Sequence, residues 1–197
     1  RDQPRSRGLG DVYKRQGVAK ARDLKNEEGN VIAVIGDGSL SGGLAYEGLN
    51  NIAETGTNTI VIVNDNDQSI AENHGGLYNN LRALRDTNGQ AENNFFKSLG
   101  FDYYYLADGN DLTALMHLFK QVKDSNHPVV LHIQTVKGKG FKFAEENREK
   151  FHAGGPFSLE TGDYLANSGG ETYSTVTTDY LLEKMAQDPT LQRLLDP

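Results

Sequence analysis

The stretch VIAVIGDGSLSGGLAYEGLNNIAETGTNTIVIVNDNDQSI, residues 31–70, decides the fold of this chain. Two continuous β-branched runs, at 31–35 and 59–63, are typical of strands that are covered on both faces of a sheet. The segment between them, 43–54, has a helical period. Its apolar side chains near one helical face are Leu44, Leu49 and Ile52. A strand, a helix and a second strand of this length predict one crossover of a parallel sheet.

The rest of the chain continues the same alternation. We expect helices over residues 17–26, 91–100 and 111–125, the last of them capped by Asp111. Strands are expected over 101–108 and 128–136. Strands that alternate with helices predict an α/β fold with three layers, in which helices cover both faces of a mostly parallel sheet.

Four parts are expected along the chain. Residues 1–16 carry five basic side chains and no apolar period, so we expect a disordered or artefactual leader. An α/β domain is expected over 17–157, a Ser/Gly-rich linker over 158–172 and the start of a truncated further domain over 173–197. Because the first residue is arginine and a helical pattern closes the sequence, we expect the chain to be incomplete.

The composition excludes several functions. A formal net charge of -7 without a basic stripe argues against nucleic acid as the main partner. Cysteine is absent, so neither disulfides nor thiolate chemistry contributes. No apolar run approaches the roughly 20 residues of a membrane span, and neither a P-loop nor a GxGxxG motif follows any strand. We therefore expect a soluble, cytoplasmic protein.

Polar residues follow both strands of the opening stretch. Asp37 comes directly after the first strand, and Asn66 follows the second strand 29 positions later. The carboxyl ends of parallel strands meet at one edge of a sheet, where ligands bind. A carboxylate and an amide oxygen suit Mg²⁺, while Gly36, Gly38 and a helix that starts near Gly42 expose backbone N–H groups to phosphate. Each turn alone is common, but the pair at crossover spacing predicts a magnesium-bridged diphosphate site.

The two turns also carry a resemblance to a known family. GDG followed about thirty residues later by NDN resembles the thiamin-diphosphate motif of the transketolase superfamily, whose fold binds that cofactor. The wider sequence is closer still to the 1-deoxy-D-xylulose-5-phosphate synthase family. The similar segments, in the family's order, are AKARDLK, VIAVIGDGSLSGGLAYEGLNN, VIVNDNDQSI, HIQTVKGKGF and EKFHAGGPF. They cover residues 17–157 well and 173–197 loosely.

The resemblance implies thiamin diphosphate and Mg²⁺ as cofactors and assigns residues to both. The family's magnesium aspartate corresponds to Asp37, its second ligand to Asn66, and its third ligand, a backbone carbonyl, to Gln68. The turn whose backbone holds the diphosphate corresponds to Gly38 and Ser39, and Asn66 also faces the diphosphate.

Further residues match the family less directly. Phe141 corresponds to an aromatic position that lines the cofactor, and His152 to a histidine near the reacting centre that can help to move protons. An equally plausible reading makes His152 a hydrogen-bonded loop residue. We expect His74 to be structural or solvated. Lys137 and Lys139 can steer a phosphorylated substrate, although most such lysines are simply solvated.

The implied parent enzyme is a homodimer that releases CO2 from pyruvate and joins the remaining two carbons to glyceraldehyde 3-phosphate, for isoprenoid and thiamin synthesis. The segment after NDN is shorter here than in the family. The family's upstream histidine segments, cofactor-activating glutamate and phosphate-binding arginines have no counterpart, so we expect little turnover from this chain alone.

Two alternatives remain open. One is the diphosphate-binding half of another transketolase-like enzyme that acts on a sugar phosphate. The other is a non-catalytic module that keeps the fold, against which the intact GDG and NDN turns argue, because loss of function would be expected to alter them first.

Overall fold

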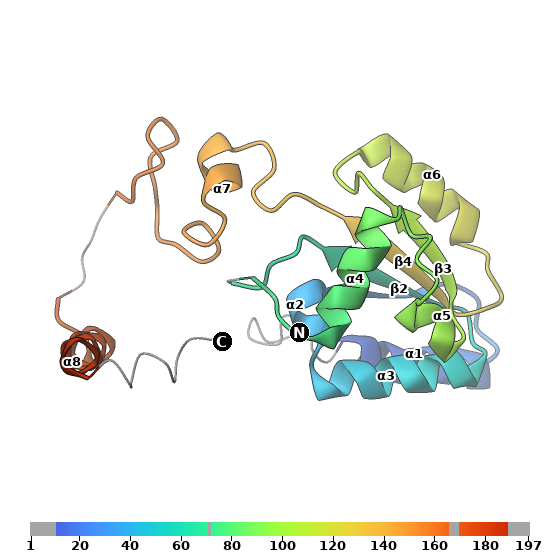
Figure 1. Ribbon diagram of the computed structural model, residues 1–197. Coiled ribbons are helices and arrows are strands. Elements are labelled where there is room, and N and C mark those ends of the chain that lie inside the picture. The colour runs from blue at the N-terminus through green and yellow to red at the C-terminus, as the bar shows by residue number, and fades with distance from the viewer. Residues whose placement is uncertain (1–10, 71, 166–169, 189–197) are drawn as a thin grey trace. The chain divides into compact units, whose positions relative to one another are not determined.

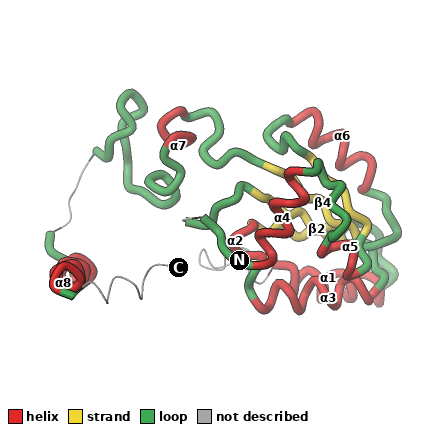
Figure 2. Tube along the Cα trace, viewed as in Figure 1, coloured by secondary structure: helices red, strands yellow, loops and turns green. Residues whose placement is uncertain are grey.

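The computed structural model describes residues 11–70, 72–165 and 170–188. Its core is a sheet of four parallel strands in the order β1-β2-β4-β3. The strands are β1 (Val31–Gly36), β2 (Thr59–Asp65), β3 (Asp102–Leu106) and β4 (Val129–Gln134). Figure 1 shows them running side by side, and Figure 2 marks them in yellow. The predicted crossover is confirmed, since β1 and β2 are parallel neighbours.

Helices separate the strands along the chain. Those within the described residues are α1 (Asp11–Leu24), α2 (Asp37–Leu40), α3 (Gly43–Thr55), α4 (Gly76–Asp86), α5 (Phe95–Leu99), α6 (Leu112–Val122), α7 (Lys142–Glu146) and α8 (Tyr173–Gln187). None of these helices has the length and apolar character needed to cross a membrane. The chain divides into two compact units, 1–153 and 154–197.

Helices cover both faces of the sheet in the first unit. On one face, apolar residues of β1 and β2 pack with Leu49 of α3, Leu84 of α4 and Phe96 of α5, all fully buried. On the other face, Leu131 of β4 packs with Val122 and its neighbours on α6. In Figure 1, α6 lies on the opposite side of the strands from α1 and α3. The predicted three-layer α/β fold is therefore confirmed.

Local capping explains where several helices begin. The Asp111 carboxylate accepts hydrogen bonds from the backbone N–H groups of Thr113 and Ala114, at 2.8 and 3.2 Å, and so caps α6 as predicted. Asn94 caps the short helix α5 in the same way. Gly42 is the N-cap of α3, close to the helix start expected from the sequence.

The prediction that both strands of the opening stretch are covered on both faces is wrong for β1. β2 is buried from Thr59 to Val63, but β1 lies at the sheet edge, where Ile32 and Val34 are 43% and 51% exposed. Of the three apolar residues expected near one face of the helix at 43–54, Leu49 and Ile52 are buried and Leu44 is 50% exposed. An apolar run predicts that a segment forms a strand. How much of that strand is buried depends on the strands and helices that pack beside it.

The expectation of a disordered leader is wrong for residues 11–16. These residues form the first part of α1, and Val12 is fully buried in the core. Residues 1–10 lie outside the described residues. The helix was not predicted here because this segment is rich in basic side chains and α1 has few buried apolar residues. Those residues are Val12 and Ala19.

We expect Gly48→Ala to destabilise the packing of α1 on α3. A Cβ atom at this position would lie 2.9 Å from the backbone N of Tyr13 and 2.9 Å from Cγ1 of Val12. The free energy of unfolding in urea should fall by about 1–3 kcal/mol, as in overpacked cores. Gly43→Ala is the matched control, because a Cβ there meets nothing within 4 Å. Equal losses in the two variants would contradict close packing at Gly48.

The second unit contains one isolated antiparallel bridge, between Phe157 and Tyr164, and the helix α8. Thr172 caps α8 through a reciprocal pair of hydrogen bonds with Thr175. The helix predicted beyond residue 173 is confirmed. The boundaries proposed for the linker over 158–172 and for the following domain stay predictions, and residues 166–169 and 189–197 lie outside the described residues.

Candidate functional site

A cavity of about 360 Å³ lies beyond the carboxyl ends of β1 and β2. Its lining residues are Gly36, Asp37, Gly38, Ser39, Asn66, Gln68, Ser69, Lys137 and His152. The two strands are in register, with Gly36 opposite Asn64, so their end turns open at the same edge of the sheet. The structure therefore brings together the predicted cofactor and metal residues except Phe141, together with His152 and Lys137, whereas Lys139 does not line the cavity.

Asp37 is a buried carboxylate, only 2% exposed. It begins the short helix α2, which the sequence analysis did not predict, and its Oδ2 accepts a hydrogen bond of 2.7 Å from the side chain of Asn73. Burial and the nearby charge of Asp65 raise the pKa of Asp37 from 3.8 to about 6, against opposing hydrogen bonds from the backbone. A cation would favour the ionised form that this environment disfavours.

Two side-chain oxygens near Asp37 lack hydrogen-bond partners. Oδ1 of Asn66 and Oε1 of Gln68 are both buried and accept no hydrogen bond. Buried polar atoms in native proteins are nearly always paired, so unpaired oxygens in a cavity need an explanation. One carboxylate and two amide oxygens form a hard donor set that fits Mg²⁺. For Gln68 the resemblance implied the backbone carbonyl, whereas the unpaired atom is in its side chain.

The donor set differs from a conventional acidic metal site. Within the described residues, no three His, Cys, Asp or Glu side chains gather into a possible metal cluster. A cation here would therefore depend on a single carboxylate, amide oxygens and ligands from a bound molecule. This dependence is typical of Mg²⁺, which usually shares phosphate oxygens with its substrate or cofactor.

Gly38 allows the two turns to approach closely. A Cβ atom at this position would lie 2.6 Å from Cβ of Ser69 and 3.0 Å from its Cα. The turn after β1 therefore packs directly on the loop after β2 with no room for a side chain. The exposed backbone of such a turn can approach a phosphate.

The remaining predicted residues differ in their placement. Lys137 lines the cavity and donates a hydrogen bond from Nζ to the backbone oxygen of Ser69. His152 also lines it and is half-buried. Phe141 is not among the lining residues: it is the N-cap of α7, and its ring contacts those of Phe143 and Phe151, each with centroids 5.5 Å apart. His74 is exposed, as expected.

Sequence reasoning missed a buried polar network beneath the cavity. The Asp65 carboxylate accepts from Arg85 Nη1 at 2.6 Å and bonds His132 Nε2 at 2.8 Å, and the other imidazole nitrogen bonds the Tyr103 hydroxyl at 2.7 Å. Arg85 also binds Asp67 at 2.6 Å. Asp65 and His132 are fully buried. Two features of the sequence could have indicated this network: the aspartate Asp65 within the NDND turn, and the histidine His132 within the otherwise apolar strand β4.

The network fixes the charges of its members. Burial acts to raise the pKa of Asp65, but hydrogen bonds from His132 and Arg85 outweigh it and hold the pKa below its ordinary value. The pKa of Arg85 is raised, because its bonds to the two carboxylates outweigh burial. Burial raises the pKa of Tyr103. An ionised Asp65 thus lies at the end of β2, directly before Asn66.

Comparisons with known proteins find a matching family model and similar proteins. The family model described as 1-deoxy-D-xylulose-5-phosphate synthase matches residues 11–93 and 85–135. The synthase of Clostridium beijerinckii is 38% identical over 207 residues, which cover 87% of this chain and 33% of that protein. The synthase of Listeria monocytogenes is 39% identical over 180 residues, with 87% and 30% covered. The chain thus spans about a third of the length of these relatives.

A solved structure supports the fold. Transketolase from Campylobacter jejuni superposes with a TM-score of 0.55 over 74% of this chain and 22% of its own, at 22% identity. This likeness concerns the fold alone. The family model, which covers more than half of the sequence and begins at the first residue of α1, decides the assignment. The chain belongs to the 1-deoxy-D-xylulose-5-phosphate synthase family.

Proposed function

We propose that this chain binds the diphosphate of thiamin diphosphate through Mg²⁺ and is part of a 1-deoxy-D-xylulose-5-phosphate synthase. One observation carries the proposal: the buried Asp37, with its raised pKa, lines the same cavity as the unpaired oxygens of Asn66 and Gln68. Curated members of the family bear this enzyme name. The chain's own residues supply the anchor for the cofactor, and the rest of the enzyme would supply its activation.

The proposal gives roles to five residues of the cavity. Asp37, Asn66 and Gln68 would hold Mg²⁺, and the backbone of the turn at Gly38 and Ser39 would lie against the diphosphate. The positive end of the α3 helix, which starts after Gly42, adds to the attraction for phosphate. Phe141 would line the cofactor only if α7 approached the cavity.

The proposed reaction joins pyruvate and glyceraldehyde 3-phosphate to give 1-deoxy-D-xylulose 5-phosphate and CO2. When bound, thiamin diphosphate would supply a thiazolium ring whose carbon, once deprotonated, is the nucleophile for a keto group, and whose positive charge stabilises the electron pair left by decarboxylation. His152 lines the cavity and would hold or move a proton at its imidazole. We further propose a cytoplasmic homodimer for the whole enzyme, with little turnover by this chain alone.

Calorimetric titration with thiamin diphosphate tests the anchor directly. We expect binding that requires Mg²⁺ and disappears when the metal is chelated, because the two unpaired amide oxygens and one carboxylate cannot hold a diphosphate without a cation. Thiamin, which lacks the diphosphate, is the matched ligand control. Equal binding of thiamin and thiamin diphosphate, or binding that ignores Mg²⁺, would exclude the proposed anchor.

The substrate needs a separate experiment on the full-length protein. We expect CO2 release from pyruvate in the presence of glyceraldehyde 3-phosphate. Transfer from a ketose phosphate without CO2 release would instead identify a transketolase that uses the same anchor. Mg²⁺-dependent cofactor binding with neither reaction would indicate a non-catalytic module.

A further inference from the structure

One arginine from another element holds the turn that carries the two amide oxygens. Arg85 of α4 donates from Nη1 to Asp65 Oδ2 and from Nη2 to Asp67 Oδ1, both at 2.6 Å. Asp65 precedes Asn66 in the chain and Asp67 follows it, so the guanidinium spans the proposed ligand. The Arg85 side chain is 9% exposed, and its contact with the fully buried Asp65 is shielded from water, whereas Asp67 is 47% exposed. A planar fork holds two carboxylates in a fixed geometry, whereas an ammonium group is a compact charge whose donors rotate.

The residue between the two amide ligands has an unusual backbone conformation. Asp67 has a φ of +63°, in the left-handed region that most residues avoid. Its N–H donates to Asp65 Oδ1 at 3.0 Å, so the same carboxylate that binds Arg85 also closes the turn. Asn66 and Gln68, on either side, both line the cavity and both have an unpaired side-chain oxygen.

The turn is also tied to the sheet. Asp65 bonds His132 of β4, and the backbone N–H of Thr135 donates to the Asp65 carbonyl at 2.8 Å. Thr135 Oγ1 donates to the side chain of Asn64 at 2.7 Å. The residues before Asn66 are therefore fixed by the neighbouring strand. The contact of Arg85 with Asp67 and the bond from the Asp67 N–H to Asp65 extend this order past Asn66.

We propose that Arg85 is a positioning residue: by joining Asp65 to Asp67 it fixes the left-handed turn that presents the side-chain oxygens of Asn66 and Gln68 to the cation of a bound diphosphate. This inference rests on the proposed function. It assigns to Asp67 a conformational role, with no contact to the cation. It also extends the donor set to the side chain of Gln68.

The test compares two substitutions at Asp67. Both Asp67→Ala and Asp67→Gly remove the carboxylate that Arg85 binds, but only glycine adopts the left-handed conformation freely. In the full-length protein with Mg²⁺ and thiamin diphosphate, we expect Asp67→Ala to raise the Mg²⁺ concentration at half-saturation about tenfold, the penalty expected for a side chain in the left-handed region. Asp67→Gly should recover most of that loss. Melting of the ligand-free protein should be similar in both, because without a cation this partly exposed turn is free to leave the left-handed conformation in Asp67→Ala.

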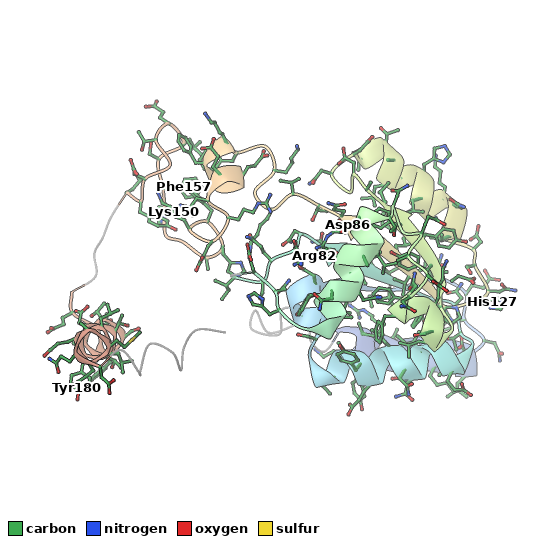
Figure 3. The ribbon with its side chains drawn as sticks, viewed as in Figure 1. Arg82, Asp86, His127, Lys150, Phe157 and Tyr180 are labelled. Atoms are coloured by element: carbon green, nitrogen blue, oxygen red, sulfur yellow. The ribbon has the colours of Figure 1, made fainter. Side chains whose placement is uncertain are left out.

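Arg85→Lys tests the other partner of the contact. It should weaken Mg²⁺ binding in the same direction, while Arg82→Lys on the same helix should not, because Arg82 is exposed. Figure 3 labels Arg82, three residues before Arg85 on α4, and Asp86, directly after it; Asp86→Ala serves as the control for loss of an acidic side chain. Wild-type binding with no difference between Asp67→Ala and Asp67→Gly would overturn the positioning role and leave the proposed function intact. Absence of Mg²⁺-dependent binding in the wild type would overturn both.

Discussion

Asp37→Asn should abolish Mg²⁺-dependent binding of thiamin diphosphate and, at the same time, stabilise the ligand-free protein. Even outer-shell partners of metal ligands contribute about 10- to 100-fold to affinity, so loss of the single carboxylate of this donor set should cost on the order of a hundredfold or more. Calorimetric titration at fixed Mg²⁺ measures this loss. The substitution keeps the size of the side chain and its ability to accept the hydrogen bond from Asn73.

The gain in stability follows from the raised pKa of Asp37. Below pH 3.8 the carboxyl is protonated in both folded and unfolded protein and costs nothing. As the pH rises from 3.8 to about 6, the unfolded chain releases this proton while the folded protein keeps it, so the folded state loses stability. One pKa unit corresponds to about 1.4 kcal/mol, so the penalty above pH 6 is on the order of 2–3 kcal/mol.

Urea unfolding of wild type and Asp37→Asn across this pH range checks the argument. The variant should have the higher free energy of unfolding at pH 7, and the difference should close towards pH 4. Asp86→Asn, at an exposed position on α4, is the control for loss of a surface charge. A variant that is less stable than the wild type at pH 7 would show that Asp37 is not a destabilising charge. The anchor would then lack the feature that most favours a cation.

The sequence predicted that Asp37 and Asn66 lie at one edge of the sheet, because the signals for this placement are local. Asp37 and Asn66 each follow a β-branched run, and the geometry of parallel strands places the ends of neighbouring runs at one edge. The carboxyl and amide groups were therefore placed correctly without knowledge of any side-chain contact. Both faces of the sheet were also predicted to carry helices, because strands alternate with helical periods along the chain.

The features that the sequence did not predict depend on partners far away in the chain. Asp65 meets Arg85 after 20 residues and His132 after 67. Nothing local indicates these pairs. The α4 helix that supplies Arg85 does have an apolar face, formed by Tyr78, Leu81 and Leu84, but the many polar residues around it drew attention away from this period. The exposure of Ile32 and Val34 depends on β1 being the edge strand of the described sheet, which its own sequence does not encode.

Asp65→Asn should be the most destabilising single substitution in this region. Arg85 is almost fully buried and binds two carboxylates, of which Asp65 is 0% exposed and Asp67 is 47% exposed. Removing one partner of a buried ion pair costs about 3–5 kcal/mol, because the remaining charge is left without compensation. His132 would also lose the charged acceptor on its Nε2 side. The free energy of unfolding at neutral pH should fall by that amount.

Asp67→Asn is the matched control, since the same guanidinium binds this second carboxylate. Exposed ion pairs contribute about 0–1 kcal/mol, so its loss should be small. The pKa of Asp65 is lowered in the folded protein, so its contribution is present above the ordinary pKa of an aspartate and is lost as the pH falls through the lowered value. The two variants should therefore differ strongly at neutral pH and converge in acid. Equal losses of unfolding free energy in the two variants at neutral pH would mean that burial does not decide the strength of these contacts. Asp65 would then not be the structural partner of Arg85, nor Asp67 a residue with a conformational role alone.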